Sequence, residues 1–157
     1  MKRVLMISTD RKAFEVGSAV RRRMVEYGEL TVGLEVIIFS LAKNGFREVK
    51  VSEKVALYPT NTKTRAGYLL KTYFLGRKLT RPNIITCQDP FETGLAGWFL
   101  SRFWNTNLEI QIHTDFLAPA FTGESWLNVC RVKLAKFILP RATQIRVVSE
   151  RIKNSLI

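Results

Sequence analysis

Short apolar segments alternate with longer segments of helical periodicity along nearly the whole chain, and this alternation constrains the fold more than any other feature. We expect strands at residues 4–8, 36–40, 55–58, 84–87, 108–113 and 144–149. We expect helices at residues 17–27, 64–79, 90–103 and 125–139. Strands separated by helices form parallel sheets, and right-handed crossovers place the helices on both faces. The sequence therefore predicts a single α/β domain over residues 1–157: a Rossmann-like, doubly wound, mostly parallel sheet of about six strands.

The chain is strongly basic. Its 157 residues include 25 Lys and Arg against 13 Asp and Glu, a formal net charge of +12. Such an excess attracts polyanions, whether nucleic acid, anionic lipid headgroups or phosphorylated substrates, without choosing among them. No apolar run reaches the ~18 residues of a membrane span. The apolar run at residues 4–7 is also shorter than the ~7–15 residues of a signal-peptide core.

The two cysteines, Cys87 and Cys130, have neither metal-ligand nor redox spacing. We expect both to be buried free thiols, Cys87 in a strand and Cys130 on an apolar helix face, which fits a cytoplasmic protein. That helix face is predicted to consist of Trp126, Val129, Cys130, Leu134, Phe137 and Ile138.

The helix at residues 64–79 carries basic residues and no acidic one. Its predicted core stripe is Ala66, Leu69, Leu70, Tyr73 and Phe74. A second apolar stripe, Tyr68, Leu75 and Leu79, lies near Lys71 and Lys78. An apolar stripe edged by lysines is typical of a helix that binds an anionic membrane surface. A loop or another domain could equally cover this stripe. Nucleic acid ranks third, because no recognised binding motif accompanies the charge.

No glycine-rich dinucleotide motif follows the first strand, and no phosphate-binding P-loop occurs. Instead, Gly17 and Ser18 precede a helix whose free N–H groups could receive an oxyanion or a sugar hydroxyl, and Asp10 could accept hydrogen bonds from hydroxyls. A simple helix cap in a solvated loop is the alternative. Asp89 and Glu92 flank Pro90 as the cap residue and third residue of a near capping box, which explains both structurally.

His113 is the only histidine, and it follows an alternation of Ile110 and Ile112 with polar residues. We expect His113 and Asp115 at the carboxyl end of this strand, the edge at which open α/β sheets bind ligands. An imidazole can exchange a proton near neutral pH, and a carboxylate two residues later can point to the same side. The alternative is a histidine that is satisfied by a backbone carbonyl and only ends the strand.

Residues 150–157 begin an amphipathic helix that has no C-terminal cap signal, so we expect the sequence to be part of a longer protein.

Four segments in order, GLEV (33–36), ITCQDPFETG (85–94), QIHTDF (111–116) and IRVVSERI (145–152), resemble the N-terminal half of GT-B glycosyltransferases of the family-4 type. The resemblance implies a retaining sugar transferase with two Rossmann-like domains, of which this one binds the acceptor. The donor nucleotide-sugar is then a co-substrate held by an absent C-terminal domain, with no metal required.

The same resemblance implies a role for His113 near the transferred sugar. It matches Ser149 and Glu150 to the Ser-Glu pair that opens the helix after the last strand. It also places Asp10 and Gly17 in the acceptor loop, although the usual paired glycines are missing there. A lipid-linked or cell-envelope acceptor would suit a cytoplasmic protein bound peripherally to the inner membrane face, without nucleic acid. The alternatives are a GT-B nucleotide-sugar epimerase half and a non-catalytic basic binding domain for anionic membrane or nucleic acid.

Overall fold

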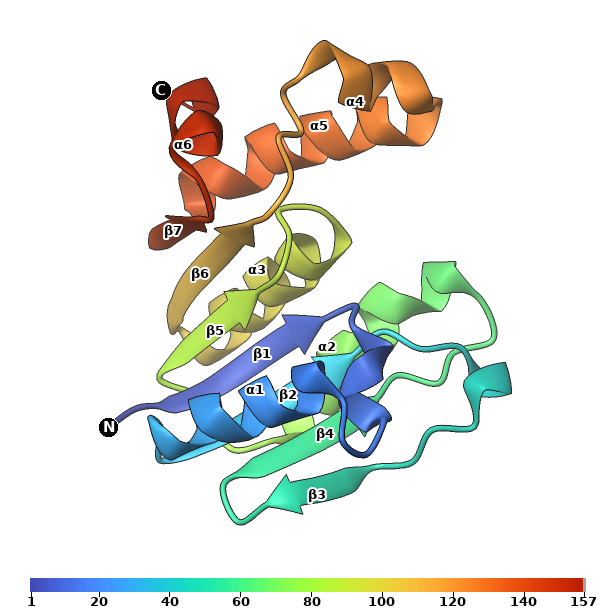
Figure 1. Ribbon diagram of the computed structural model, residues 1–157, viewed down its shortest axis with the longest axis vertical. Helices are drawn as coiled ribbons and strands as arrows, with labels where there is room; N and C mark the ends of the chain where they lie inside the picture. The colour runs from blue at the N-terminus through green and yellow to red at the C-terminus, as the bar shows by residue number, and fades with distance from the viewer. Residues whose placement is uncertain (157) are drawn as a thin grey trace.

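The computed structural model describes residues 1–156 and contains one seven-stranded sheet of order β3-β4-β2-β1-β5-β6-β7 (Figure 1). The strands are β1 Arg3–Ser8, β2 Gly33–Ile38, β3 Val49–Ser52, β4 Val55–Pro59, β5 Ile84–Cys87, β6 Asn107–Ile112 and β7 Gln144–Val147. All neighbours pair in parallel except β3, which runs antiparallel to β4. The predicted fold class, a Rossmann-like α/β sheet with helices on both faces, is confirmed.

Helices cover the two faces unequally. The α-helices are α1 Ala19–Glu29, α2 Tyr68–Lys78, α3 Glu92–Trp104, α4 Pro119–Glu124, α5 Trp126–Ile138 and α6 Glu150–Leu156. Single 3-10 turns are η1 Arg11–Phe14, η2 Ala42–Asn44, η3 Arg65–Gly67 and η4 Leu139–Arg141. Helix α1 lies on one face of the sheet, in front of it in Figure 1, and α2 and α3 lie on the other. None of the helices within residues 1–156 is long and apolar enough to cross a bilayer.

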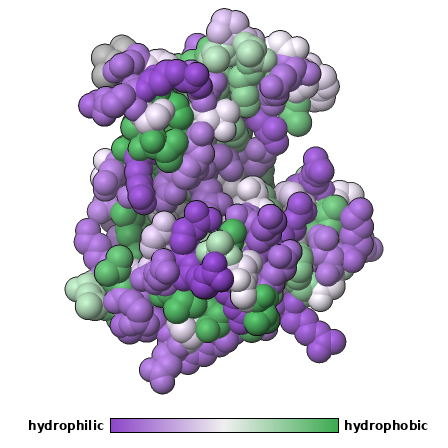
Figure 2. Space-filling view, viewed as in Figure 1, coloured by the Kyte–Doolittle hydropathy of each residue, from purple (hydrophilic) through white to green (hydrophobic). Residues whose placement is uncertain are grey.

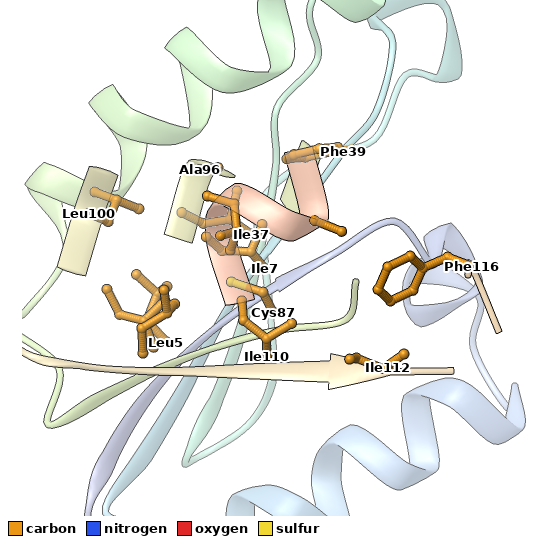
Figure 3. Close-up of a cluster of buried hydrophobic side chains, with 14 of the residues drawn as sticks. Leu5, Ile7, Ile37, Phe39, Cys87, Ala96, Leu100, Ile110, Ile112 and Phe116 are labelled. Atoms are coloured by element: carbon orange, nitrogen blue, oxygen red, sulfur yellow. The ribbon is translucent and has the colours of Figure 1, made fainter. Parts of the chain in front are cut away.

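Alternation along the strands creates two cores. Leu5 and Ile7 of β1 and Ile110 and Ile112 of β6 enter the larger one, which α2, α3 and α5 cover (Figure 3). Met6 of β1 enters the smaller core under α1. Because successive side chains of a strand point to opposite faces, one apolar strand can feed both cores.

Two elements are absent from the sequence prediction. Strand β3 is short, half-exposed and on the sheet edge, so it lacks the continuous apolar run of the buried parallel strands. Helix α4 is a six-residue helix without buried residues, which is too short for a periodic signal.

The buried face of α2 differs from the prediction, and only part of the predicted core stripe packs inward. Thr72 and Gly76 are fully buried, and a Cβ on Gly76 would lie 2.5 Å from Cδ1 of Leu100 on α3. This close approach requires small residues, and it turns the flanking Tyr68, Leu75 and Leu79 toward the core. Of the predicted core residues, Leu69 and Tyr73 do pack against the larger core, whereas Leu70 and Phe74 are 64% and 50% exposed. The three residues predicted to face a membrane therefore face the protein.

The predicted core face of α5 is confirmed for Leu134 and Ile138 and wrong for its other four residues. Asn128, Ala135 and Ile138 point inward, whereas Trp126 is 78% exposed and Val129 and Phe137 are exposed as well. Cys130 shares this outer face, so its predicted burial is wrong. The predicted burial of Cys87, under α3, is confirmed.

Candidate functional site

The parallel strands bring residues from distant parts of the sequence to one edge of the sheet, where the carboxyl ends of β1, β2, β5, β6 and β7 meet. Ligands of open α/β sheets bind at this edge. Two separate groups of side chains form there. We call them the arginine cleft, on the side of α2, α3 and α5, and the His113 chain, on the side of α1.

The arginine cleft is a cavity of about 430 Å³ between the amino-terminal ends of α2, α3 and α5. The space-filling view shows a notch at this edge, between α4–α5 and the segments that contain η1 and η3 (Figure 2). The apolar part of its wall includes Phe39, Tyr68, Leu69 and Leu127. Its guanidinium groups come from Arg11 after β1, Arg65 before α2 and Arg131 on α5.

The three arginines differ in their charge balance. Arg131 is neutralised by Glu92, because its Nε and Nη2 donate to Oε1 at 3.0 and 2.8 Å. Within residues 1–156, neither Arg11 nor Arg65 has an ion-pair partner. Both also line a neighbouring cavity of about 600 Å³. An apolar wall beside two uncompensated guanidinium groups suits a ligand that joins an apolar part to an anion.

Of the predicted loop residues, Asp10 caps η1 and Ser18 caps α1, and Gly17 directly precedes the cap of α1. An Asp10 carboxylate oxygen accepts from the backbone N–H of Lys12 at 3.1 Å. Ser18 Oγ accepts from the N–H of Arg21 and donates to the carbonyl of Lys12. Gly17 has a φ of +80°, a left-handed conformation that favours glycine. Of the three, Asp10 lines the 600 Å³ cavity beside the arginine cleft.

The predicted capping box at Asp89 and Glu92 is wrong. Helix α3 begins at Glu92, later than expected, and Asp89 forms a turn in which its carboxylate accepts from the N–H of Phe91 at 2.8 Å. Burial raises the pKa of Asp89 despite this hydrogen bond. Glu92 is held by Arg131 across the cleft, so its contact is tertiary and not a local cap.

His113 is the end of a hydrogen-bonded chain on the opposite face of β6. Thr86 Oγ1 donates to Oε1 of Glu109 at 2.8 Å and accepts from Nε2 of Gln111 at 3.0 Å. Gln111 Oε1 lies 3.3 Å from Nε2 of His113. Since an amide oxygen only accepts, Nε2 of His113 carries the proton, and Nδ1 is left as an acceptor with no partner among residues 1–156.

Two arginines act on the His113 imidazole. Partial burial lowers its pKa, and the positive charges of Arg146 on β7 and Arg23 on α1 lower it further. Its neutral form is therefore favoured at neutral pH.

The structure does not bring Asp115 to His113. Asp115 is largely buried, and its carboxylate lies 3.6 Å from Nε of Arg151 on α6. Ser149 caps α6 by accepting from the N–H of Ile152, and Glu150 pairs with Lys153 one turn later. Of these contacts, only the Asp115–Arg151 pair joins α6 to the segment after β6, whereas those of Ser149 and Glu150 are local to α6.

A larger cavity, of about 650 Å³, lies at the opposite edge, where β6 and β7 begin. Its lining includes Arg102, Arg141 and the neutral polar residues Asn105 and Thr106. We favour the carboxyl edge as the functional site because loops of doubly wound sheets converge on ligands there.

Sequence reasoning missed Arg11, Arg65 and Arg131 as a group, since they come from three distant segments. It also missed Gln111 as the partner of His113 and Glu109 as a member of the same hydrogen-bonded chain. The two-residue spacing of positions 109, 111 and 113 could have predicted this chain, because residues i, i+2 and i+4 of a strand point to one face.

No protein-family model matches this sequence, and no curated protein matches it. Among solved structures, the fold is similar to that of UDP-GlcNAc 2-epimerase from Methanocaldococcus jannaschii, with a TM-score of 0.59 and 15% sequence identity. The alignment covers 99% of this chain and 42% of the epimerase chain, so the present chain spans less than half the length of that structure. At this identity the likeness shows the fold alone, a Rossmann-like α/β fold.

Proposed function

We propose that this chain is the acceptor-binding half of a retaining GT-B glycosyltransferase, which transfers a sugar from a nucleotide-sugar to an acceptor that has both an anionic and an apolar part. The arginine cleft carries this proposal. It lies at the ligand edge of the sheet, and it combines two guanidinium groups free of carboxylate partners within residues 1–156 with an apolar wall.

In this proposal, Arg11 and Arg65 bind the phosphate groups of the acceptor, since guanidinium groups match phosphate oxygens in shape and charge. The wall formed by Phe39, Tyr68, Leu69 and Leu127 binds the apolar part. The Arg131–Glu92 pair joins α5 to α3 and fixes one side of the cleft. The nucleotide-sugar is bound by a second domain outside this sequence.

His113 is proposed to contact the transferred sugar or the acceptor hydroxyl. Gln111 holds Nε2–H, so Nδ1 is free to accept a hydrogen bond from a hydroxyl. The lowered pKa keeps this nitrogen unprotonated at neutral pH. We assign no nucleophile among the residues of this chain.

Isothermal titration calorimetry with farnesyl diphosphate, which joins a diphosphate to an apolar chain, tests the proposal. We expect binding to the wild-type chain and a loss of affinity of about 100-fold or more in the variant Arg11→Gln/Arg65→Gln, because hydrogen bonds to charged groups contribute roughly 1.5–3 kcal/mol each. Leu127→Ser should weaken farnesyl diphosphate but leave inorganic diphosphate unchanged. Arg47→Gln, which removes an exposed arginine before β3, is the matched control and should bind like the wild type.

Equal affinity in the double variant and in the Arg47→Gln control would contradict the acceptor role of the cleft. The second candidate is half of a nucleotide-sugar epimerase, favoured by the similarity to the UDP-GlcNAc 2-epimerase fold. UDP-GlcNAc binding that depends on Arg11 and Arg65, without farnesyl diphosphate binding, would favour this candidate.

A further inference from the structure

Large apolar side chains are exposed on the outer surface of the layer formed by α2, α3 and α5. We call this set the aromatic band: Leu70 and Phe74 on α2, Phe99 and Phe103 on α3, and Trp126 and Phe137 on α5. Isolated exposed apolar residues are ordinary, whereas a connected set on one face marks a binding surface.

Ring contacts join four members of the band across the helices: Phe74, Phe99, Phe103 and Phe137. Tyr73 lies between Phe74 and Phe103, with ring centroids 6.0 Å from each. Trp98 connects Phe99 to Phe137, at 4.9 and 5.4 Å. Phe99 and Phe103 are one helical turn apart, so the two sets of contacts meet on α3. Trp126 continues the band along α5, on the helix face that also carries Cys130 and Phe137.

The charges around the band are almost all positive. The three helices and the turn after α5 carry the basic residues Lys71, Arg77, Lys78, Arg102, Lys133, Lys136 and Arg141. The only acidic residue in α2, α3 and α5 is Glu92, which is already bonded to Arg131. Two of the basic groups lie directly on the rings: the guanidinium of Arg77 is 4.6 Å from the centroid of Phe103, and that of Arg141 is 3.7 Å from that of Phe137.

We propose that the aromatic band docks on an anionic membrane surface. Aromatic and leucine side chains can enter the headgroup and acyl boundary while flanking lysines and arginines reach anionic headgroups, so both kinds of residue gain from one surface. A nucleic acid would attract the basic residues, but it offers no apolar layer into which the six apolar side chains of the band could insert. This proposal stands independently of the transferase function.

Docking in this orientation would also place the arginine cleft beside the membrane. Ala66 in η3, Leu69 at the start of α2 and Leu127 at the start of α5 line the cleft, and the band continues along the two α-helices. A lipid-linked anion could then enter the cleft without leaving the bilayer surface. This orientation differs from the one predicted from the sequence, because Tyr68, Leu75 and Leu79 lie on the protein side of α2.

Vesicle co-sedimentation tests the proposal on the chain as it is. We expect binding to vesicles of phosphatidylglycerol and phosphatidylcholine and at least tenfold weaker binding to pure phosphatidylcholine. The variant Leu70→Ser/Phe74→Ser should lower the affinity for the anionic vesicles by about tenfold or more. Leu30→Ser is the matched control, because Leu30 is 75% exposed after α1, on the other side of the sheet, and its loss should change binding less than twofold.

Cys130 allows a second, independent measurement. Because Cys87 is fully buried, an environment-sensitive thiol dye should label Cys130 alone, between Trp126 and Phe137 on the band. We expect its emission to shift to the blue with anionic vesicles and to stay unchanged with DNA. Circular dichroism confirms that each variant is folded.

Three results would overturn the proposal: no sedimentation with anionic vesicles, equal binding of Leu70→Ser/Phe74→Ser and Leu30→Ser, or no dye shift on binding. A further result would also count against the proposal. If about 0.5 M salt abolished binding to DNA and to vesicles equally, and Leu70→Ser/Phe74→Ser left both unchanged, the binding would be only a general attraction to polyanions.

Discussion

Gly97 is where α3 lies closest to the sheet, and Gly97→Ala should destabilise the protein. An added Cβ would overlap Sγ of Cys87 on β5 and would lie 3.1 Å from Cδ1 of Leu108 on β6. Both neighbours are completely or almost completely buried, so neither can move into solvent. The helix must therefore shift away from the strands, or the side chains below it must leave their preferred rotamers.

Two opposing effects set the size of this change. Replacing glycine by alanine inside a helix gains about 1 kcal/mol of helix propensity. Overpacking a closely packed core costs about 1–3 kcal/mol, and contact with an enclosed sulfur favours the upper end. We expect a net loss of about 1–2 kcal/mol in the free energy of unfolding, which corresponds to roughly 2–8 °C in Tm for a chain of this length.

Urea denaturation and thermal melts measure this loss, and Gly123→Ala is the matched control. Gly123 lies in the exposed helix α4, and an added Cβ there meets no atom within 4 Å. The same substitution should stabilise the protein by about 0.5–1 kcal/mol there. A decrease in the free energy of unfolding at Gly97 and an increase at Gly123 would separate the packing effect from helix propensity.

A double-mutant cycle with Cys87→Ala separates this contact from other causes. Removing Sγ creates a small cavity in the wild type but relieves the overlap in Gly97→Ala, so the two changes should couple by about 1 kcal/mol or more. If Gly97→Ala proved as stable as the wild type, or if the two changes added within about 0.3 kcal/mol, the close packing of α3 on β5 would be refuted.

Two further predictions concern titrating side chains. Nitrogen NMR should show that the proton of neutral His113 is on Nε2, and Gln111→Leu should remove this preference. The same titration should give a pKa below the ordinary value of about 6.5, and Arg146→Gln should raise that pKa. Because the folded state favours neutral His113, its contribution to the free energy of unfolding should be complete above pH ~6.5 and lost as the pH falls through the lowered pKa. A measured pKa of His113 at or above the ordinary value would contradict this prediction. Burial raises the pKa of Glu35 on β2, so the free energy of unfolding should fall as the pH rises from its ordinary pKa of about 4.3 through the raised value. Glu35→Gln should remove this decline and be more stable at pH 7 in urea melts, and an unchanged pH profile would show that Glu35 is not buried enough to matter.

Local sequence patterns were sufficient to predict the fold class and the location of His113. Apolar runs of strand length, separated by helical segments, allow few arrangements other than a doubly wound parallel sheet, because connections between parallel strands are right-handed and carry helices. The alternation in β6 also predicted that His113 follows the carboxyl end of a strand, as observed. These features depend on local periodicity, which a sequence records directly.

Which helix faces are buried and which side chains come into contact depend on tertiary packing. Periodicity identified two apolar stripes on α2, but the approach of Gly76 to Leu100 on α3 selected the inner one. Arg11, Arg65 and Arg131 meet because separate strands end at one edge of the sheet, and Arg131 finds Glu92 only there. Such contacts depend on the neighbours that an element acquires on folding, and local sequence does not specify those neighbours.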